Sequence, residues 1–209
     1  MHNIVPLILA AGESSRIGFP KALLPLGEDT FLTHILRTLR SADLPNARIV
    51  LGAHESQIRP FLDNHRVEVH INPDPSRGQI YSIQLAAGNL DSAVAGCLIW
   101  PVDHPLVTAG LLEDLVALFE NTAAPLAMPR CGGQAGHPAI FGRSLIAELL
   151  AEPPGANPKG IVARHRAEAV WLPTTERGTI EDVDTPDDYY RIAGETLSSA
   201  LERQNSRKP

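Results

Sequence analysis

The feature that most constrains the fold is an apolar segment near the N-terminus that runs directly into a loop of small residues. Residues 7–9 are Leu-Ile-Leu, and residues 10–15 are Ala-Ala-Gly-Glu-Ser-Ser. An apolar run without alternation is typical of a strand that both faces of a parallel sheet bury. The loop carries Arg16 and leads to Lys21. Small residues let backbone N–H groups approach a phosphate chain, and two cations neutralise its charge. The segment therefore predicts a cradle for a nucleoside triphosphate.

Two other phosphate-binding loops do not match this segment. A Walker A loop ends in Gly-Lys-Ser/Thr, whereas Lys21 follows Pro20 and precedes Ala22. A dinucleotide fingerprint needs three glycines at fixed spacing, which Gly12 and Gly18 do not supply. The remaining alternative is an ordinary strand-to-helix connection whose charges are solvated.

Length and composition limit the class of protein. A chain of 209 residues with 44% hydrophobic residues can form one α/β domain with an ample core. A net charge of −6 argues against a general nucleic-acid binder. No apolar run is long enough for a membrane span, and we expect no membrane association. Two cysteines form neither a disulfide framework nor a metal-site spacing, and there is no signal-type N-terminus, so a cytoplasmic protein is expected.

Strands and helices are predicted to alternate along the chain. This pattern favours a mostly parallel sheet with helices on both faces, in a single domain over residues 1–201, with a disordered tail over 202–209. The predicted strands cover residues 4–9, 47–51, 67–71, 97–100, 126–128, 139–141 and 169–172. The predicted helices cover residues 31–39, 55–62, 78–90, 108–121, 144–150 and 186–201. Ligands of such sheets bind beyond the carboxyl ends of the strands.

Asp103 follows one of these apolar strands and lies between Pro101 and Pro105. The prolines fix φ locally and restrict where the carboxylate can lie. An ordinary turn aspartate is an equal alternative when the residue is taken alone. Beside a phosphate loop, however, a carboxylate at a strand end is well placed to hold Mg²⁺.

A second acidic cluster precedes the last predicted helix, over residues 181–188. Thr185 or Asp184 can cap that helix, and Asp187 and Asp188 favour its positive end. Capping does not require both Asp182 and Asp184. Either carboxylate is therefore available for a site.

The loop over residues 9–21 resembles the signature of the MobA-like family of nucleotidyltransferases, Leu-Ala-Ala/Gly-Gly followed by Arg-Met-Gly and a Lys before Leu-Leu. Ile17 replaces the usual Met, and Leu23 and Leu24 match the continuation. Blocks similar to the family's Pro-x-Asp-x-Pro, Gly-His-Pro and Asp-x-Asp-Thr-Pro follow in the expected order. The resemblance covers nearly the whole chain and implies a Rossmann-like fold of the nucleotide-diphospho-sugar transferase type.

The resemblance also implies roles for individual residues. Arg16, Lys21 and Asp103 are expected to be catalytic, and Asp103 and Asp184 to hold Mg²⁺, with Asp182 as the alternative second ligand. Gly136, His137 and Pro138 are expected to lie over the acceptor substrate, or to form an ordinary turn. His34 and His54 are expected to be structural. Nucleotide contacts are expected from Leu9, Ala10, Ala11, Gly12, Glu13, Ser14, Ser15, Arg16, Lys21, Asn72, Gly78 and Ser82.

The implied reaction is attack of an acceptor phosphate on the α-phosphorus of a nucleoside triphosphate. The Ala10-Ala11-Gly12 sequence is more similar to the cytidylyl branch of the family than to the guanylyl branch, which tends to carry Gly-Gly. The resemblance implies CTP as the substrate, since an extra methyl group would narrow the base pocket and favour a pyrimidine. Molybdopterin is then the implied acceptor, with a molybdoenzyme or its maturation chaperone as a protein partner. The alternatives are transfer to another sugar or alcohol phosphate, and a non-catalytic nucleotide-binding accessory protein of molybdoenzyme maturation. Gln79 and Ile80 depart from the Gly-Met pattern of relatives near the base.

Overall fold

The centre of the sheet is β1 (Ile4–Ala10), in a computed structural model that describes residues 2–206. It pairs in parallel with β4 (Ala47–Leu51) on one side and with β6 (Gly96–Pro101) on the other. All its residues are buried except the half-buried Val5. The apolar segment at residues 7–9 is therefore a central strand, as its lack of alternation predicts.

The rest of the sheet extends from both sides of this centre. β5 (Val67–Ile71) pairs in parallel with β4, and all its residues are half-buried or exposed, which fits an edge strand. Beyond β6 lie β9 (Ala139–Gly142), β7 (Leu126–Cys131) and β10 (Val170–Thr174), in the order β10-β7-β9-β6-β1-β4-β5. β9 runs antiparallel to both neighbours, while β7 and β10 are parallel. The prediction of a mostly parallel sheet is confirmed, although β9 is reversed within it and the short strand β8 (Gln134–Ala135) pairs antiparallel with β7.

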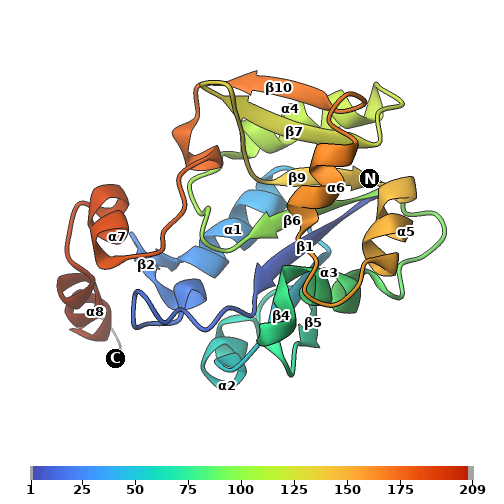
Figure 1. Cartoon of the computed structure of the whole chain (residues 1–209). Coiled ribbons are helices and arrows are strands. Elements are labelled where there is room, and N and C mark those ends of the chain that lie inside the picture. Colours follow the sequence, from blue (N-terminus) through green and yellow to red (C-terminus); the bar gives the residue numbers. More distant parts are fainter. Residues whose placement is uncertain (1, 207–209) are drawn as a thin grey trace.

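Helices cover both faces of the sheet (Figure 1). Each face has its own apolar cluster, one built around the first and fourth helices and the other around the third and fifth. Two such layers of burial are the physical reason why the central strands are apolar on both faces. One face carries α1 (Phe31–Ser41) and α4 (Ala109–Glu120), and the other carries α3 (Gly78–Ala87), α5 (Arg143–Ala151) and α6 (Pro158–Arg164).

Short elements complete the connections. A 3₁₀ turn over Lys21–Leu23 leads to the hairpin β2 (Pro25–Leu26) and β3 (Asp29–Thr30). Thr30 then begins α1 through a capping box with Thr33. The remaining short elements are α2 (Glu55–Ile58), β8 (Gln134–Ala135) and the 3₁₀ turns Arg59–Phe61, Pro75–Arg77 and Arg177–Thr179.

The prediction of one long C-terminal helix over residues 186–201 is wrong. The chain forms α7 (Pro186–Ala193) and α8 (Leu197–Ser206), separated at Gly194. Gly194 adopts a φ of 73°, the left-handed conformation that commonly ends a helix at glycine. The last helix therefore turns back instead of continuing.

Residues 202–206 belong to α8, so the predicted disordered tail over 202–209 is wrong for this part. Arg203 explains the order, because its guanidinium binds Glu195 and donates to the Gly27 carbonyl at 3.1 Å. Ala200 is buried and anchors the same helix. Residues 207–209 lie outside the described residues. Within residues 2–206, no helix has the length and apolar character that a membrane crossing requires.

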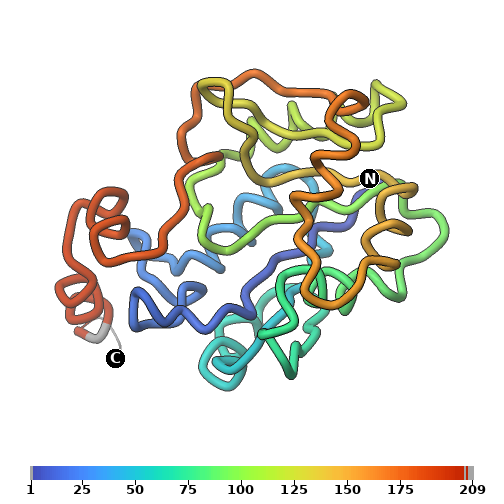
Figure 2. The backbone as a smooth tube through the Cα atoms, viewed as in Figure 1, coloured from blue at the N-terminus to red at the C-terminus, as the bar shows by residue number. Residues whose placement is uncertain are grey.

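The parallel strands β1, β4, β5 and β6 bring their carboxyl ends to one edge of the sheet. The loops that follow them therefore converge at that edge. Figure 2 also shows the chain near residue 184 passing beside the chain that leaves β6. A main-chain hydrogen bond of 3.0 Å from the Val183 amide to the Asp103 carbonyl joins these two segments.

Candidate active site

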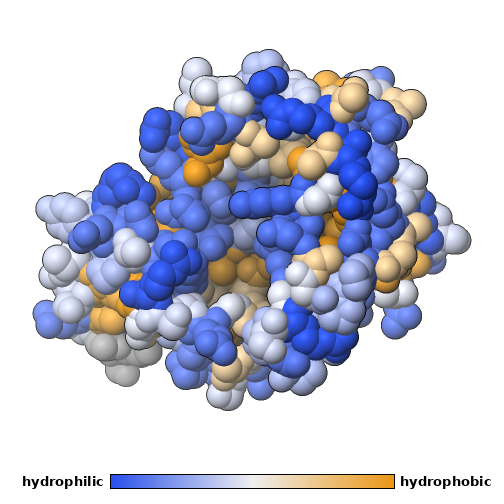
Figure 3. Space-filling view, viewed as in Figure 1, coloured by the Kyte–Doolittle hydropathy of each residue, from blue (hydrophilic) through white to orange (hydrophobic). Residues whose placement is uncertain are grey.

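A cleft of about 380 Å³ lies at the carboxyl ends of β1 and β6. The surface in Figure 3 is hollowed near its centre, with hydrophilic residues prominent around the hollow. Most of the predicted nucleotide-binding residues line this cleft, although they come from segments far apart in the sequence. The lining comprises Leu9, Ala10, Ala11, Gly12, Glu13, Ser14, Ser15, Arg16, Pro20, Lys21, Ala22, His54, Ile58, Pro75, Gly78, Gln79, Ser82, Pro101, Val102, Asp103 and Asp184.

The loop after β1 is held in a compact turn by its own small residues. Ser14 has a φ of 56° and Gly18 a φ of 71°, and the Gly18 amide donates to the Ser14 carbonyl at 3.0 Å. The Ser14 hydroxyl accepts a hydrogen bond of 3.0 Å from the Lys21 amide. The loop thereby curls back on itself and brings the start of the next turn, with Lys21, to the cleft.

A cluster of two cations and two carboxylates forms one wall of the cleft. Lys21 Nζ lies 2.8 Å from Asp103 Oδ2 and also contacts Asp184 Oδ1. Arg16 reaches the other oxygen of Asp184 at 2.7 Å. Three separate segments therefore supply charged groups to one point.

The charges in this cluster support one another. Burial lowers the pKa of Lys21, but Asp103 and Asp184 outweigh that effect and hold it above the ordinary value for lysine. Partial burial raises the pKa of Asp184, but Lys21 and then Arg16 outweigh it and hold it below the usual range. Lys21 and Asp184 are therefore both charged at neutral pH.

The two candidate carboxylates of the second acidic cluster differ in position. Asp184 lines the cleft, and its amide donates to Asp188 at 3.2 Å, within the capping box that begins α7. Asp182 is exposed and does not line the cleft. Val183 between them is fully buried, so it fixes the segment against the core.

Asn72 lies behind the cleft, although the resemblance placed it among the nucleotide contacts. It is buried, and its Nδ2 donates to the Ser82 hydroxyl at 2.9 Å. Its Oδ1 accepts from the Asp74 amide at 2.9 Å. Ser82 lines the cleft, and the hydrogen bond from Asn72 orients its hydroxyl there.

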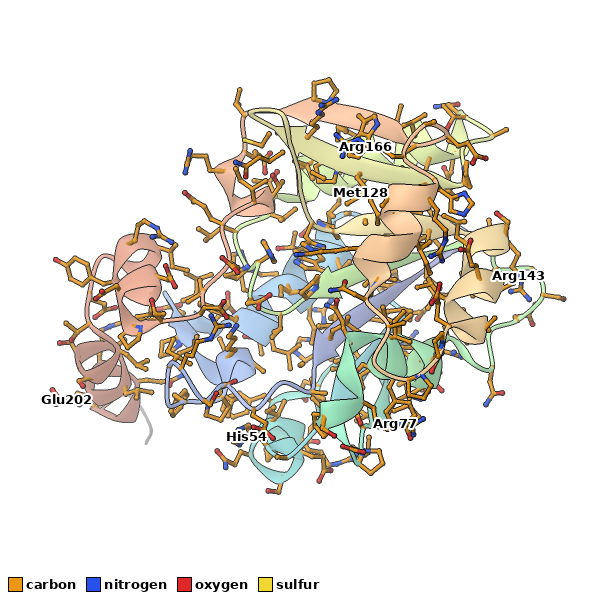
Figure 4. The ribbon with its side chains drawn as sticks, viewed as in Figure 1. His54, Arg77, Met128, Arg143, Arg166 and Glu202 are labelled. Atoms are coloured by element: carbon orange, nitrogen blue, oxygen red, sulfur yellow. The ribbon has the colours of Figure 1, made fainter. Side chains whose placement is uncertain are left out.

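His54, which we expect to be structural, lines the cleft. Figure 4 places it at the start of α2. Its Nε2 lies 3.2 Å from the Glu13 carbonyl, which ties the β4–α2 connection to the phosphate loop. Gly52 permits this approach, because a Cβ there would lie 2.5 Å from the Ala11 carbonyl oxygen. A prediction that β4 pairs with β1 would have placed His54 near the cleft, because the loops that follow neighbouring parallel strands meet.

Gly136, His137 and Pro138 do not line the cleft. The His137 ring packs against the His104 ring with centroids 4.8 Å apart, and its amide donates to the Thr179 carbonyl at 2.7 Å. Burial and then His104 lower the pKa of His137 to about 4, so the ring is neutral at pH 7. A Cβ on Gly136 would meet Thr179 at 2.8 Å, which explains glycine there. This block is packed against the Asp103 segment through His104, beside the cleft.

The carboxylates of Asp103 and Asp184 suit a magnesium ion. The two carboxylates converge on one point, because the Lys21 ammonium contacts both of them. Mg²⁺ is commonly held by one or two carboxylates, with water and substrate phosphates completing its shell. Among the described residues no three His, Cys, Asp or Glu side chains gather as a self-sufficient metal site. Two carboxylates are the protein donors that a phosphate-bound Mg²⁺ commonly uses.

The family model of the MobA-like NTP transferase domain matches residues 6–169, which is most of the chain. The chain belongs to the MobA-like NTP transferase family. The sequence resemblance and the fold that it implied are confirmed. Members of this family are nucleotidyltransferases.

Relatives in this family include proteins of molybdenum cofactor synthesis. The chain is 26% identical to the molybdenum cofactor cytidylyltransferase of Escherichia coli K12, over 90% of this chain and 95% of that protein. It is 33% identical to the "Probable molybdenum cofactor guanylyltransferase" of Rhodopirellula baltica, over 60% of each chain. Both kinds of base specificity therefore occur among relatives.

A solved structure gives the same picture of the fold. Rv0371c of Mycobacterium tuberculosis H37Rv superposes with a TM-score of 0.81 at 27% identity, covering 93% of this chain and 98% of that one. The same protein has been solved as a complex with manganese, with a TM-score of 0.76 at 25% identity. That complex is consistent with divalent metal use in the family.

Proposed function

We propose that this chain is a Mg²⁺-dependent nucleotidyltransferase that transfers CMP from CTP to the terminal phosphate of molybdopterin and releases pyrophosphate. The observation that carries the proposal is the meeting of Lys21, Asp103 and Asp184 beside the loop after β1, inside one cleft. Phosphoryl chemistry of this kind needs alignment and charge stabilisation more than a covalent nucleophile. The cluster supplies both.

Each charged group has a distinct task in the proposed reaction. Arg16, which is largely exposed at the rim, binds the β- and γ-phosphates. Lys21 stabilises the negative charge that develops around the α-phosphorus. An oxygen of the acceptor phosphate forms the new P–O bond, and the bond to the pyrophosphate oxygen breaks.

Asp103 and Asp184 are the residues that would hold Mg²⁺. When bound, the metal neutralises charge on the phosphate oxygens that meet at the reacting phosphorus. The loop from Ala11 to Ser15 aligns the triphosphate through its backbone amides. Ser82, oriented by Asn72, and Gly78 line the same cleft and are the proposed contacts to the base and ribose.

The preference for CTP rests on the Ala10-Ala11-Gly12 sequence. Ala11 lines the cleft and is buried beside the sheet, and its methyl group is the proposed contact to the base. A pocket narrowed by one methyl group favours a pyrimidine over a purine. The cytidylyltransferase of E. coli, with its 95% coverage, supports the same choice.

The acceptor assignment rests on the molybdenum cofactor nucleotidyltransferases among the relatives named above. A molybdoenzyme or its maturation chaperone is the proposed protein partner. Cys97 and Cys131 are both free and buried, which suits the reducing cytoplasm that we propose as its location.

The function is tested by pyrophosphate release from the purified full chain. CTP, GTP, ATP and UTP are each supplied with Mg²⁺ and with molybdopterin, a sugar phosphate or an alcohol phosphate. Release only with CTP and molybdopterin supports the proposal. Release with another phosphate acceptor assigns a different nucleotidyltransferase, and nucleotide binding without release in any combination indicates an accessory protein.

Replacing Ala11 by Gly is expected to shift base selection toward GTP. One methyl group in a pocket changes discrimination by about 1–3 kcal/mol at most, so the shift is partial. The measurement is the ratio of kcat/KM for CTP and GTP in wild type and variant. Gly12→Ala is the matched change in the opposite direction at the next position, where a Cβ meets no atom within 4 Å. An unchanged ratio in a folded Ala11→Gly variant contradicts the role of this methyl group.

A further inference from the structure

The cations assigned to the phosphates are bound, in this structure, to the carboxylates assigned to the metal. Lys21 Nζ contacts Asp103 Oδ2 at 2.8 Å and also Asp184 Oδ1. Arg16 contacts Asp184 Oδ2 at 2.7 Å. Both oxygens of Asp184 and one of Asp103 therefore face a cation of the protein itself.

We propose that Lys21 holds the metal position in the substrate-free protein, with Arg16 as a weaker second cation, and that triphosphate draws both away as metal enters. The inference rests on the proposed function, because it takes Asp103 and Asp184 as the metal ligands. It adds an order of events. Free metal binds poorly to the empty cleft, and metal and triphosphate raise each other's affinity.

The two cations differ in how strongly they block the metal. The Lys21 side chain is 15% exposed and the Arg16 side chain 68% exposed. Solvent screens an exposed ion pair, whereas a half-buried pair between two carboxylates keeps most of its strength. Lys21 is therefore the main competitor.

Lys21 is also built to move. The hydrogen bond from its amide to Ser14 fixes its backbone. The ammonium stands on a flexible four-carbon side chain, so it can change position while the backbone stays in place. The same side chain brings it to the loop after β1, where the phosphates would lie. A triphosphate carries more negative charge than the two carboxylates together. It can therefore compete with them for the Lys21 ammonium.

The mutual charge of the cluster explains the exchange. Two carboxylates within reach of one ammonium repel each other when that ammonium is removed. A divalent cation or the lysine can relieve this repulsion, and both cannot occupy the same point. Removing the lysine charge must therefore increase metal affinity in the absence of nucleotide.

The test is a titration of the full chain with Mn²⁺ alone, followed by electron paramagnetic resonance, without nucleotide or acceptor. We expect Lys21→Met to bind Mn²⁺ about 10-fold or more tightly than wild type, the scale of one half-buried charge pair. Arg16→Met should tighten binding by about threefold or less. Lys159→Met is the matched control, because the same charge is removed from a lysine with no contact to either carboxylate, and its affinity should equal that of wild type.

Two further variants keep the result interpretable. Lys21→Gln retains hydrogen-bond donors without the charge, and it should also bind Mn²⁺ more tightly than wild type. It provides an independent result if Lys21→Met folds poorly. Lys21→Met combined with Asp103→Asn should lose the tightened binding. Equal Mn²⁺ affinity of wild type and both Lys21 variants overturns the proposal, as does tight binding that survives in the double variant.

The outcome is separable from the proposed function. Failure of nucleotidyl transfer appears as no pyrophosphate release by wild type, whereas the Mn²⁺ titrations involve neither nucleotide nor acceptor. Thermal unfolding supplies a second readout. Without metal, Lys21→Met should unfold at a lower temperature than wild type. Mn²⁺ should raise the unfolding temperature of Lys21→Met by more than it raises that of wild type.

Discussion

Replacing Asp103 by Asn is expected to lower kcat by about 100-fold or more, the scale of a lost key electrostatic group, while the protein stays folded. The amide keeps the shape of the side chain and removes the charge that a divalent cation requires. The fold is retained because the main-chain hydrogen bond from Val183 to Asp103 does not depend on the side chain. Lys21 also keeps its contact with Asp184.

The measurement is steady-state pyrophosphate release at saturating nucleotide and Mg²⁺, with the unfolding temperature recorded beside it. His104→Gln, one residue away, is a useful comparison because it changes a buried ring without removing a carboxylate. Near wild-type turnover of the folded Asp103→Asn variant would show that this carboxylate holds no essential metal. A large loss accompanied by unfolding would instead assign Asp103 a structural role.

Replacing Asp184 by Asn is expected to have a comparable effect, with a loss of kcat of about 100-fold. Both of its oxygens face cations in the cleft, and its pKa lies below the usual range, because Lys21 and Arg16 outweigh the effect of its partial burial. Asp182→Asn is the matched control. It makes the same chemical change two residues away, on an exposed side chain outside the cleft, and should leave kcat within about twofold, as is usual for an exposed charge.

The pair is informative because both variants alter the same acidic cluster and the same net charge. If kcat falls only in Asp184→Asn when the two variants are measured side by side, Asp184 is the carboxylate that acts in the cleft. Equal losses would show that the charge of the whole cluster matters, and a loss only in Asp182→Asn would reverse the assignment. The capping box between Thr185 and Asp188 is untouched in both, so α7 should begin at the same residue.

Much of the fold could be predicted because the relevant signals are local. The apolar runs before Ala10 and Pro101 mark strands that are buried on both faces, and both lie at the centre of the sheet. Pro186 and the acidic residues after it mark a helix start, which the capping box confirms. The end of that helix was missed although Gly194 was a visible signal, because a glycine inside a polar helical pattern is also tolerated.

The site could be predicted less completely, since its geometry depends on residues distant in sequence. The loop over residues 10–21 and Asp103 carry their own signals, and the structure brings them together in the cleft. His54 carries no such signal, because its position follows from the pairing of β4 with β1. The roles of all these residues stay predictions until the variants are measured.

The α/β class of the fold and the position of a small-residue loop after its first strand follow from the sequence alone. They do so because strand burial, loop chemistry and capping are properties of neighbouring residues. Tertiary structure decided which of Asp182 and Asp184 faces the cleft, that Asn72 supports Ser82 from behind, and that Lys21 lies between two carboxylates. These outcomes depend on strand order and on side-chain direction, because they join residues from different elements; Lys21 and Asp103, for example, are 82 positions apart. Neighbouring residues do not encode them.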